Sequence, residues 1–120
     1  MRHDDLYLAD ALQAPADLRE YLSKHPQEEF LADRFQQSFL YHRLMIIGEA
    51  AVSLRRSYEA RYPELPWAKL VGLRNRLVHA YFDLDLTLVW NIAVGGMQPL
   101  REQLERILET EFPDAEKPGR

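Results

Sequence analysis

The sequence predicts an all-α fold, an up-down bundle of four to five helices that forms one domain over residues 1–112. Apolar residues recur at three- and four-residue spacing along most of the 120 residues, which is typical of amphipathic helices. No segment of useful length alternates apolar and polar residues, and neither Asn-Gly nor Asp-Gly occurs as a hairpin turn. With 47% hydrophobic residues, the chain is long enough to bury one core.

The first helical region is expected over residues 4–24. Pro15 is predicted to interrupt or bend it, because proline lacks a backbone N–H and clashes with the preceding turn. His25-Pro26 ends this region, and residues 27–31 are expected to form one short turn.

A long second helix is predicted to begin after Asp33 and to run to about Tyr62. Asp33 is suited to cap the helix, with Gln36 placed to reach back to it. Its apolar stripe comprises Leu40, Tyr41, Leu44, Ile47, Gly48, Ala51, Leu54 and Tyr58. Because glycine lowers helix propensity, Gly48 suggests the close approach of another backbone.

The third and fourth helices are expected over about 66–80 and from Asp85 to about Phe112. Pro66 is suited to the first helical position, and Asp85 is a plausible cap, with Leu84 and Val89 as a hydrophobic staple. Within the fourth helix, Gly95, Gly96 and Pro99 predict a bend or a local opening. Residues 113–120 are polar and are predicted to be a frayed tail.

The net charge of −4 is unevenly distributed along the chain. Residues 34–76 carry 8 basic and 3 acidic residues, whereas residues 1–33 carry 3 and 8 and residues 77–120 carry 4 and 8. The overall charge argues against non-specific nucleic-acid binding, and no DNA partner is expected. The basic middle segment has two interpretations, chance on solvated helix faces or a local anion site.

Several classes of protein are excluded by what the sequence lacks. It has no cysteine, and therefore no disulfide, thiolate nucleophile or cysteine-ligated metal. The acidic N-terminal residues argue against a signal peptide, and no apolar run is long enough to span a bilayer. His3, His25 and His42 lack metal-ligand spacing. We therefore expect a cytoplasmic protein with no metal and no cofactor.

Arg74 is the one charged residue in an apolar stripe of the third helix, whose other members are Trp67, Leu70, Val71, Leu77, Val78 and Tyr81. An arginine in such a stripe reaches out to solvent, pairs with an acid, or faces a cleft that holds an anion. Glu49 on the neighbouring helix is the natural acid for a structural ion pair.

His79 follows Arg74 by five residues, so the two side chains are about 140° apart on a regular helix. Asn75 and His79, by contrast, share one face. From the residues alone, His79 is either a catalytic group or an ordinary residue at a helix end.

Two segments resemble a known family. They are IIGEAA (residues 46–51) and YPELPWAKLVGLRNRLVHAYFDLDLTLVW (residues 62–90), which contains an Arg-x4-His-x-Tyr motif formed by Arg74, His79 and Tyr81. These segments resemble the HepT-like ribonuclease toxins of the HEPN superfamily. The departures are Ala80, where relatives usually have an acid, Asp83, where they usually have glycine, and Arg76, which adds a positive charge between the motif residues.

The resemblance implies a homodimer that brings two Arg74/His79 sets into one cleft and cuts RNA without a metal ion. It also implies a minimal nucleotidyltransferase as antitoxin partner, in a type II or type VII toxin–antitoxin pair, which in some systems transfers AMP to the motif tyrosine, here Tyr81. Asn75 and Arg76 are expected to support the catalytic pair.

The chemistry is consistent with these expectations. Histidine exchanges protons near neutral pH, and arginine stabilises phosphate charge. The alternatives are a non-catalytic binding module that presents substrate or nucleotide to a nucleotidyltransferase, and a purely structural helical dimer.

Overall fold

The computed structural model describes residues 3–79, 85–95 and 97–115, and this part of the chain contains six helices and no strand. The helices are α1 (Asp4–Lys24), α2 (Gln27–Ala32), α3 (Arg34–Tyr58), α4 (Trp67–His79), α5 (Leu86–Val94) and α6 (Met97–Glu111). The all-α prediction is confirmed. The number of helices exceeds the expected four to five because α2 is a helix in its own right and the predicted fourth helix is divided into α5 and α6.

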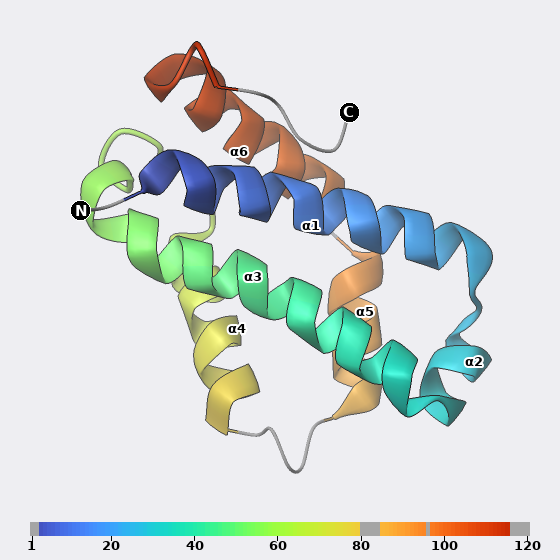
Figure 1. Cartoon of the computed structure of the whole chain (residues 1–120). Helices are drawn as coiled ribbons and strands as arrows, with labels where there is room; N and C mark the ends of the chain where they lie inside the picture. Colours follow the sequence, from blue (N-terminus) through green and yellow to red (C-terminus); the bar gives the residue numbers. More distant parts are fainter. Residues whose placement is uncertain (1–2, 80–84, 96, 116–120) are drawn as a thin grey trace.

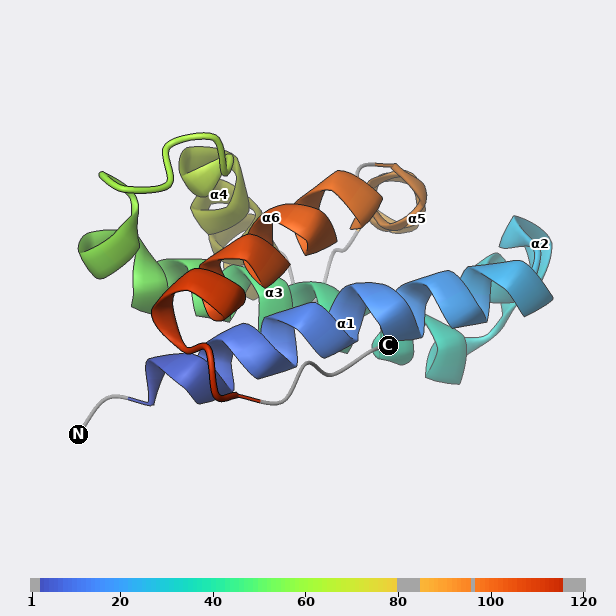
Figure 2. The same ribbon diagram turned by 90° about the horizontal axis from the view of Figure 1, so that it is seen from above.

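The two longest helices, α1 and α3, lie side by side and run in opposite directions (Figure 1). Helix α6 packs along α1, and α4 packs on α3. Seen from above, α4 and α5 lie on the same side of the α1–α3 layer (Figure 2). Helix α4, which carries Arg74 and His79, is therefore an outer helix whose main support is α3.

The core lies between α1, α3 and α6. Its fully buried side chains are aliphatic with one aromatic exception, and they are Leu8, Leu12, Leu18, Phe30, Leu40, Leu44, Ile47, Leu54, Val89, Ile107 and Leu108. Burial of each such side chain stabilises the fold by roughly 1.5–3 kcal/mol before the entropy of ordering is counted. In the described part of the chain, no polar or charged residue is buried. None of the described helices has the length and apolar character needed to cross a membrane.

Pro15 does not interrupt α1, so of the two predicted outcomes, an interruption or a bend, the interruption is wrong. The helix is continuous from Asp4 to Lys24, and Pro15 is buried within it. Proline removes only one hydrogen bond of the helix, and α1 packs against α3 and α6 along its length. Packing on both neighbours outweighs the local cost.

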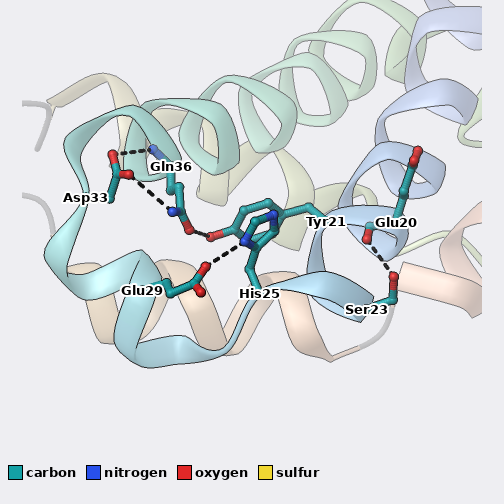
Figure 3. A network of polar contacts seen from close by, with 7 residues as sticks. All are labelled: Glu20, Tyr21, Ser23, His25, Glu29, Asp33 and Gln36. Carbon is teal, nitrogen blue, oxygen red and sulfur yellow. Dashed lines mark hydrogen bonds and ion pairs between the residues drawn. The ribbon is translucent and has the colours of Figure 1, made fainter.

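A polar network fixes the joint between α1, α2 and α3 (Figure 3). The Asp33 carboxylate accepts hydrogen bonds from the backbone N–H of Phe35 at 2.8 Å and of Gln36 at 3.4 Å, which confirms the predicted cap. The Gln36 amide also donates to Asp33, at 3.2 Å, and accepts from the hydroxyl of Tyr21. The Tyr21 ring stacks on His25. Burial is the main cause of the raised pKa of Tyr21, and Glu29 and Asp33 add to it.

Helix α3 ends at Tyr58, four residues before the predicted end. The chain then turns through residues 59–61, and the Tyr62 N–H donates to the Tyr58 carbonyl at 2.9 Å. Pro66 directly precedes α4, and its carbonyl accepts from Leu70 N–H at 3.0 Å. The turn redirects the chain so that α4 crosses back over α3. At the entry to α4, the Trp67 indole N–H donates to the Tyr62 carbonyl at 2.8 Å.

The predicted bend between residues 95 and 99 is a complete break. Helix α5 ends at Val94, its C-cap residue Gly95 donates its N–H to the Asn91 carbonyl at 3.1 Å, and α6 begins at Met97. Pro99 lies in the first turn of α6, where a missing N–H costs nothing. Asp85 caps α5 by accepting from Leu88 N–H at 3.1 Å, as predicted.

Two predictions fall partly outside the described residues. Leu84, expected to form the staple with Val89, lies there, although Val89 itself is buried. Of the predicted tail, residues 113–115 form a turn and Ala115 packs against the core, whereas residues 116–120 lie outside the described part.

Candidate active site

The site is built where α4 crosses α3, and Gly48 allows the close contact. A Cβ atom added to Gly48 would lie 2.6 Å from the Cβ of Arg74 and 3.2 Å from its Cα. Real Cβ atoms essentially never approach this closely. The absent side chain thus lets the Arg74 backbone rest directly on α3, which confirms the predicted close approach at Gly48.

The Arg74 side chain pairs with an acid of α3. Its Nε donates to Glu49 Oε1 at 2.9 Å, and its Nη1 donates to Asn75 Oδ1 at 3.0 Å. The arginine side chain is 33% exposed. Of the three possibilities that the sequence left open, the structure shows pairing with an acid. The guanidinium nevertheless reaches solvent, and its Nη2 takes part in neither of these two bonds.

His79 is the last residue of α4 and is exposed. In the part of the chain that the structure describes, no hydrogen bond or ion pair joins its ring to another side chain. The buried residues of α4, Trp67, Leu70 and Leu77, lie on the side of Arg74, so His79 points away from the core. One chain therefore does not bring Arg74 and His79 together.

The two supporting residues lie on different sides of this pair. Asn75 is exposed and accepts a hydrogen bond from Arg74, so its amide contacts the arginine. Arg76 is exposed and lines a pocket of about 490 Å³ between α4, α5 and α6. The pocket floor is largely apolar, and Lys69 and Arg76 are the two cations along it; the complete lining is Pro66, Lys69, Leu70, Gly72, Leu73, Arg76, Ile92 and Leu100. The outer surface of α4 is thus positively charged on this side.

Tyr81, the predicted modification site, lies outside the described residues, as do Ala80 and Asp83. Among the described residues, no three His, Asp or Glu side chains lie close enough together to hold a metal ion.

Tyr41 of α3 makes a hydrogen bond to α4 that the sequence analysis did not predict. Its hydroxyl donates to the backbone carbonyl of Leu77 at 3.0 Å, two residues before His79. The apolar stripe of α3 suggests only that Tyr41 is a core or dimer contact. The only feature of the sequence that points to this hydrogen bond is the residue type, because the hydroxyl of a half-buried tyrosine usually has a hydrogen-bond partner.

Comparison with known proteins identifies the family. The sequence profile of the family described as "Ribonuclease HepT-like" matches residues 11–107. The chain belongs to the HepT-like ribonuclease family. The match covers α2, α3, α4 and α5 completely and most of α1 and α6.

Curated proteins resemble the chain over most of its length. The "Probable ribonuclease HepT" of Thermococcus cleftensis is 30% identical over 105 residues, covering 88% of this chain and 94% of that protein. The "Putative RNase MJ1380" of Methanocaldococcus jannaschii is 30% identical over 99 residues, covering 82% of this chain and 91% of that protein. A third protein, the "Gamma-glutamylcyclotransferase and putative RNase MJ0434" of the same archaeon, is 30% identical over 110 residues, but the chain spans only 50% of its length. No solved structure matches the chain.

Proposed function

We propose that this HepT-like protein is a metal-independent endoribonuclease that acts in the cytoplasm as the toxin of a type II or type VII toxin–antitoxin pair. The observation that carries the proposal is the placement of Arg74 and His79. Both lie on α4, one anchored against α3 and the other exposed at the helix end. Membership of the HepT-like ribonuclease family supports RNA as the substrate.

RNA supplies its own nucleophile. The 2′-oxygen attacks the adjacent phosphorus, the bond from phosphorus to the 5′-oxygen breaks, and the products are a 2′,3′-cyclic phosphate and a 5′-hydroxyl. His79 of one copy accepts the 2′-hydroxyl proton, and His79 of a second copy donates a proton to the leaving 5′-oxygen. Arg74 stabilises the charge that develops on the phosphate oxygens.

The geometry of a single chain supports a site composed of two copies. Arg74 and His79 point to different sides of α4, and one histidine does not serve as base and acid at once. A two-fold dimer through α4 and the α5–α6 region would bring a second set into one cleft. Exposed Val78 and Val94, with 42% and 57% of their surface accessible, supply apolar contacts for such a dimer.

The test is cleavage of total RNA by the purified protein, with analysis of the fragment ends. We expect His79→Ala and Arg74→Ala each to abolish cleavage, EDTA to have no effect, and the fragments to carry 2′,3′-cyclic phosphates. Arg74→Lys keeps a positive charge but loses the planar guanidinium, which can donate two parallel hydrogen bonds to a phosphate. We therefore expect it to lower cleavage about as much as Arg74→Ala does. The matched controls His3→Ala and Arg19→Ala remove exposed residues at the start of α1 and within it, on a different helix from the site, and are expected to leave cleavage unchanged. Loss of cleavage on chelation, or retention in His79→Ala, would contradict the mechanism.

Regulation is proposed to act at Tyr81. A partner nucleotidyltransferase would direct the phenol oxygen onto the α-phosphorus of ATP, which forms a phosphodiester and releases pyrophosphate. The added negative charge would compete with the RNA phosphate for Arg74 and Arg76, and the adenosine would block entry. Incubation with the partner and ATP should add AMP to the intact mass, and Tyr81→Phe should prevent this. Equal modification of Tyr81→Phe, or RNA cleavage by the modified protein, would refute the proposal.

A non-catalytic binding module is the alternative, and the Arg74–Glu49 ion pair is the observation in its favour. In a module that presents substrate or nucleotide to a nucleotidyltransferase, this arginine needs only its structural role. Expression of the chain alone distinguishes the two functions. Growth arrest that disappears with His79→Ala supports the ribonuclease, whereas the absence of growth arrest and of RNA cleavage supports the module.

A further inference from the structure

A side-chain hydrogen bond from α3 reaches the end of α4 that carries His79. Tyr41 Oη donates to the Leu77 carbonyl at 3.0 Å. Leu77 is buried, with 3% of its surface accessible, and lies in the last turn of the helix. Tyr41 and Gly48 are seven residues apart and therefore lie on one face of α3. That face contacts α4 at both Leu77 and Arg74.

A hydrogen bond from a neighbouring helix stabilises the last turn of a helix more than it stabilises the middle. The last four carbonyls of a helix receive no hydrogen bond from an N–H group of the same helix, and helix ends fray. Helix α4 is held at its beginning by the Trp67–Tyr62 hydrogen bond and at its centre by the Arg74–Glu49 pair. Tyr41 supplies the corresponding contact at the end.

The position of His79 depends on this backbone. Its ring is exposed, and no described side chain holds it. A general base must lie within hydrogen-bonding distance of the proton that it removes, and a displacement of about 1 Å lowers rates as much as 10²-fold. The order of the last turn of α4 therefore sets how often the imidazole is in place.

We infer that Tyr41 is a positioning residue, whose hydroxyl holds the last turn of α4 and thereby places His79 for proton transfer. The inference rests on the proposed ribonuclease function. The proposed role belongs to the Tyr41 hydroxyl and not to its ring. Phenylalanine at this position preserves the packing of the ring and removes only the hydroxyl.

Tyr41→Phe tests the inference, and Tyr58→Phe is its matched control. Tyr58 is on the same helix, and its hydroxyl donates to Asp4 of α1 at 3.2 Å, away from α4. The first measurement is amide hydrogen exchange in the full chain. We expect Tyr41→Phe to lower the protection of the amides of residues 77–79 by roughly 3- to 10-fold, the effect of one lost hydrogen bond. Protection in the first turn of α4 should remain unchanged, and Tyr58→Phe should leave residues 77–79 unaffected.

The second measurement is steady-state cleavage of RNA. We expect Tyr41→Phe to lower kcat about tenfold and to leave KM within about twofold, because Arg74 still binds the phosphate. Unchanged protection of residues 77–79 would overturn the inference, and so would unchanged kcat, a change in KM alone, or equal effects of Tyr58→Phe. If the wild-type protein does not cut RNA, the proposed function fails. The exchange data then show independently whether Tyr41 holds the helix end.

Discussion

At the scale of single residues, two glycines on neighbouring helices have opposite surroundings. Gly48 faces the Cα and Cβ of Arg74, whereas a Cβ added to Gly72 would meet nothing within 4 Å. Both glycines lie inside helices, where alanine is intrinsically favoured by about 1 kcal/mol. The same substitution is therefore expected to have opposite effects at the two positions.

We predict that Gly48→Ala destabilises the protein by about 1–3 kcal/mol, because the new methyl group forces α3 and α4 apart. Gly72→Ala should raise stability by up to about 1 kcal/mol, because its methyl group has room. Urea denaturation of both variants measures the difference. A Gly48→Ala variant as stable as Gly72→Ala would show that the α3–α4 contact is not tight. Gly48→Ala should also reduce cleavage, since it displaces Arg74.

At the scale of elements, the turn that leads from α3 to α4 is attached to the far end of α6. The Tyr62 hydroxyl donates to Glu111 Oε2 at 2.7 Å, and Arg61 Nη1 donates to Glu111 Oε1 at 2.7 Å. The hydrogen bond from Tyr62 is the largest cause that lowers the pKa of Glu111 below its ordinary value of 4.5, and Arg61 lowers it further. This attachment fixes where α4 begins.

We predict that Tyr62→Phe destabilises the protein by about 1–3 kcal/mol at neutral pH, because Glu111 loses a charge-assisted hydrogen bond. A lowered carboxylate pKa stabilises the fold above about pH 4.5, and this stabilisation is lost as the pH falls through the lowered folded value. The difference between wild type and variant should therefore shrink in acid. Thermal unfolding at a series of pH values measures it, and a difference independent of pH would contradict the role of Glu111.

At the scale of the whole molecule, the composite site requires a dimer. We predict that the protein has about twice the monomer mass of 14.1 kDa in solution at micromolar concentration. There are two reasons for this prediction. The apolar side chains of Val78 and Val94 are exposed, and the side chains of Arg74 and His79 point to different sides of α4. Light scattering measures the mass, and a stable monomer would remove the basis for the shared cleft.

Mixing active and inactive chains tests whether each site needs two copies. If one His79 acts as base and the other as acid, mixed dimers of wild type and His79→Ala are inactive. Cleavage should then fall with the square of the wild-type fraction after subunit exchange. A linear fall would show that each chain works alone. The corresponding mixture with His3→Ala, in which every dimer keeps both His79 residues, should show no loss of cleavage.

The helical class, the Asp33 and Asp85 caps, and the close approach at Gly48 could all be predicted from the amino-acid sequence. These features depend on local spacing and on the properties of individual residue types, which a sequence displays directly. The motif around Arg74 and His79 and the resemblance to HepT-like ribonucleases were also evident from the sequence.

How these parts fit together became clear only from the three-dimensional structure. It showed α1 continuous through Pro15, because packing against α3 and α6 outweighs one lost hydrogen bond. It ended α3 at Tyr58, where the turn returns the chain to cross α3. It also joined Arg74 to Glu49 and Tyr41 to the Leu77 carbonyl, across 25 and 36 residues of sequence. Such contacts depend on the angle at which two helices cross, and that angle follows from the packing of the whole core rather than from the spacing of residues in either helix.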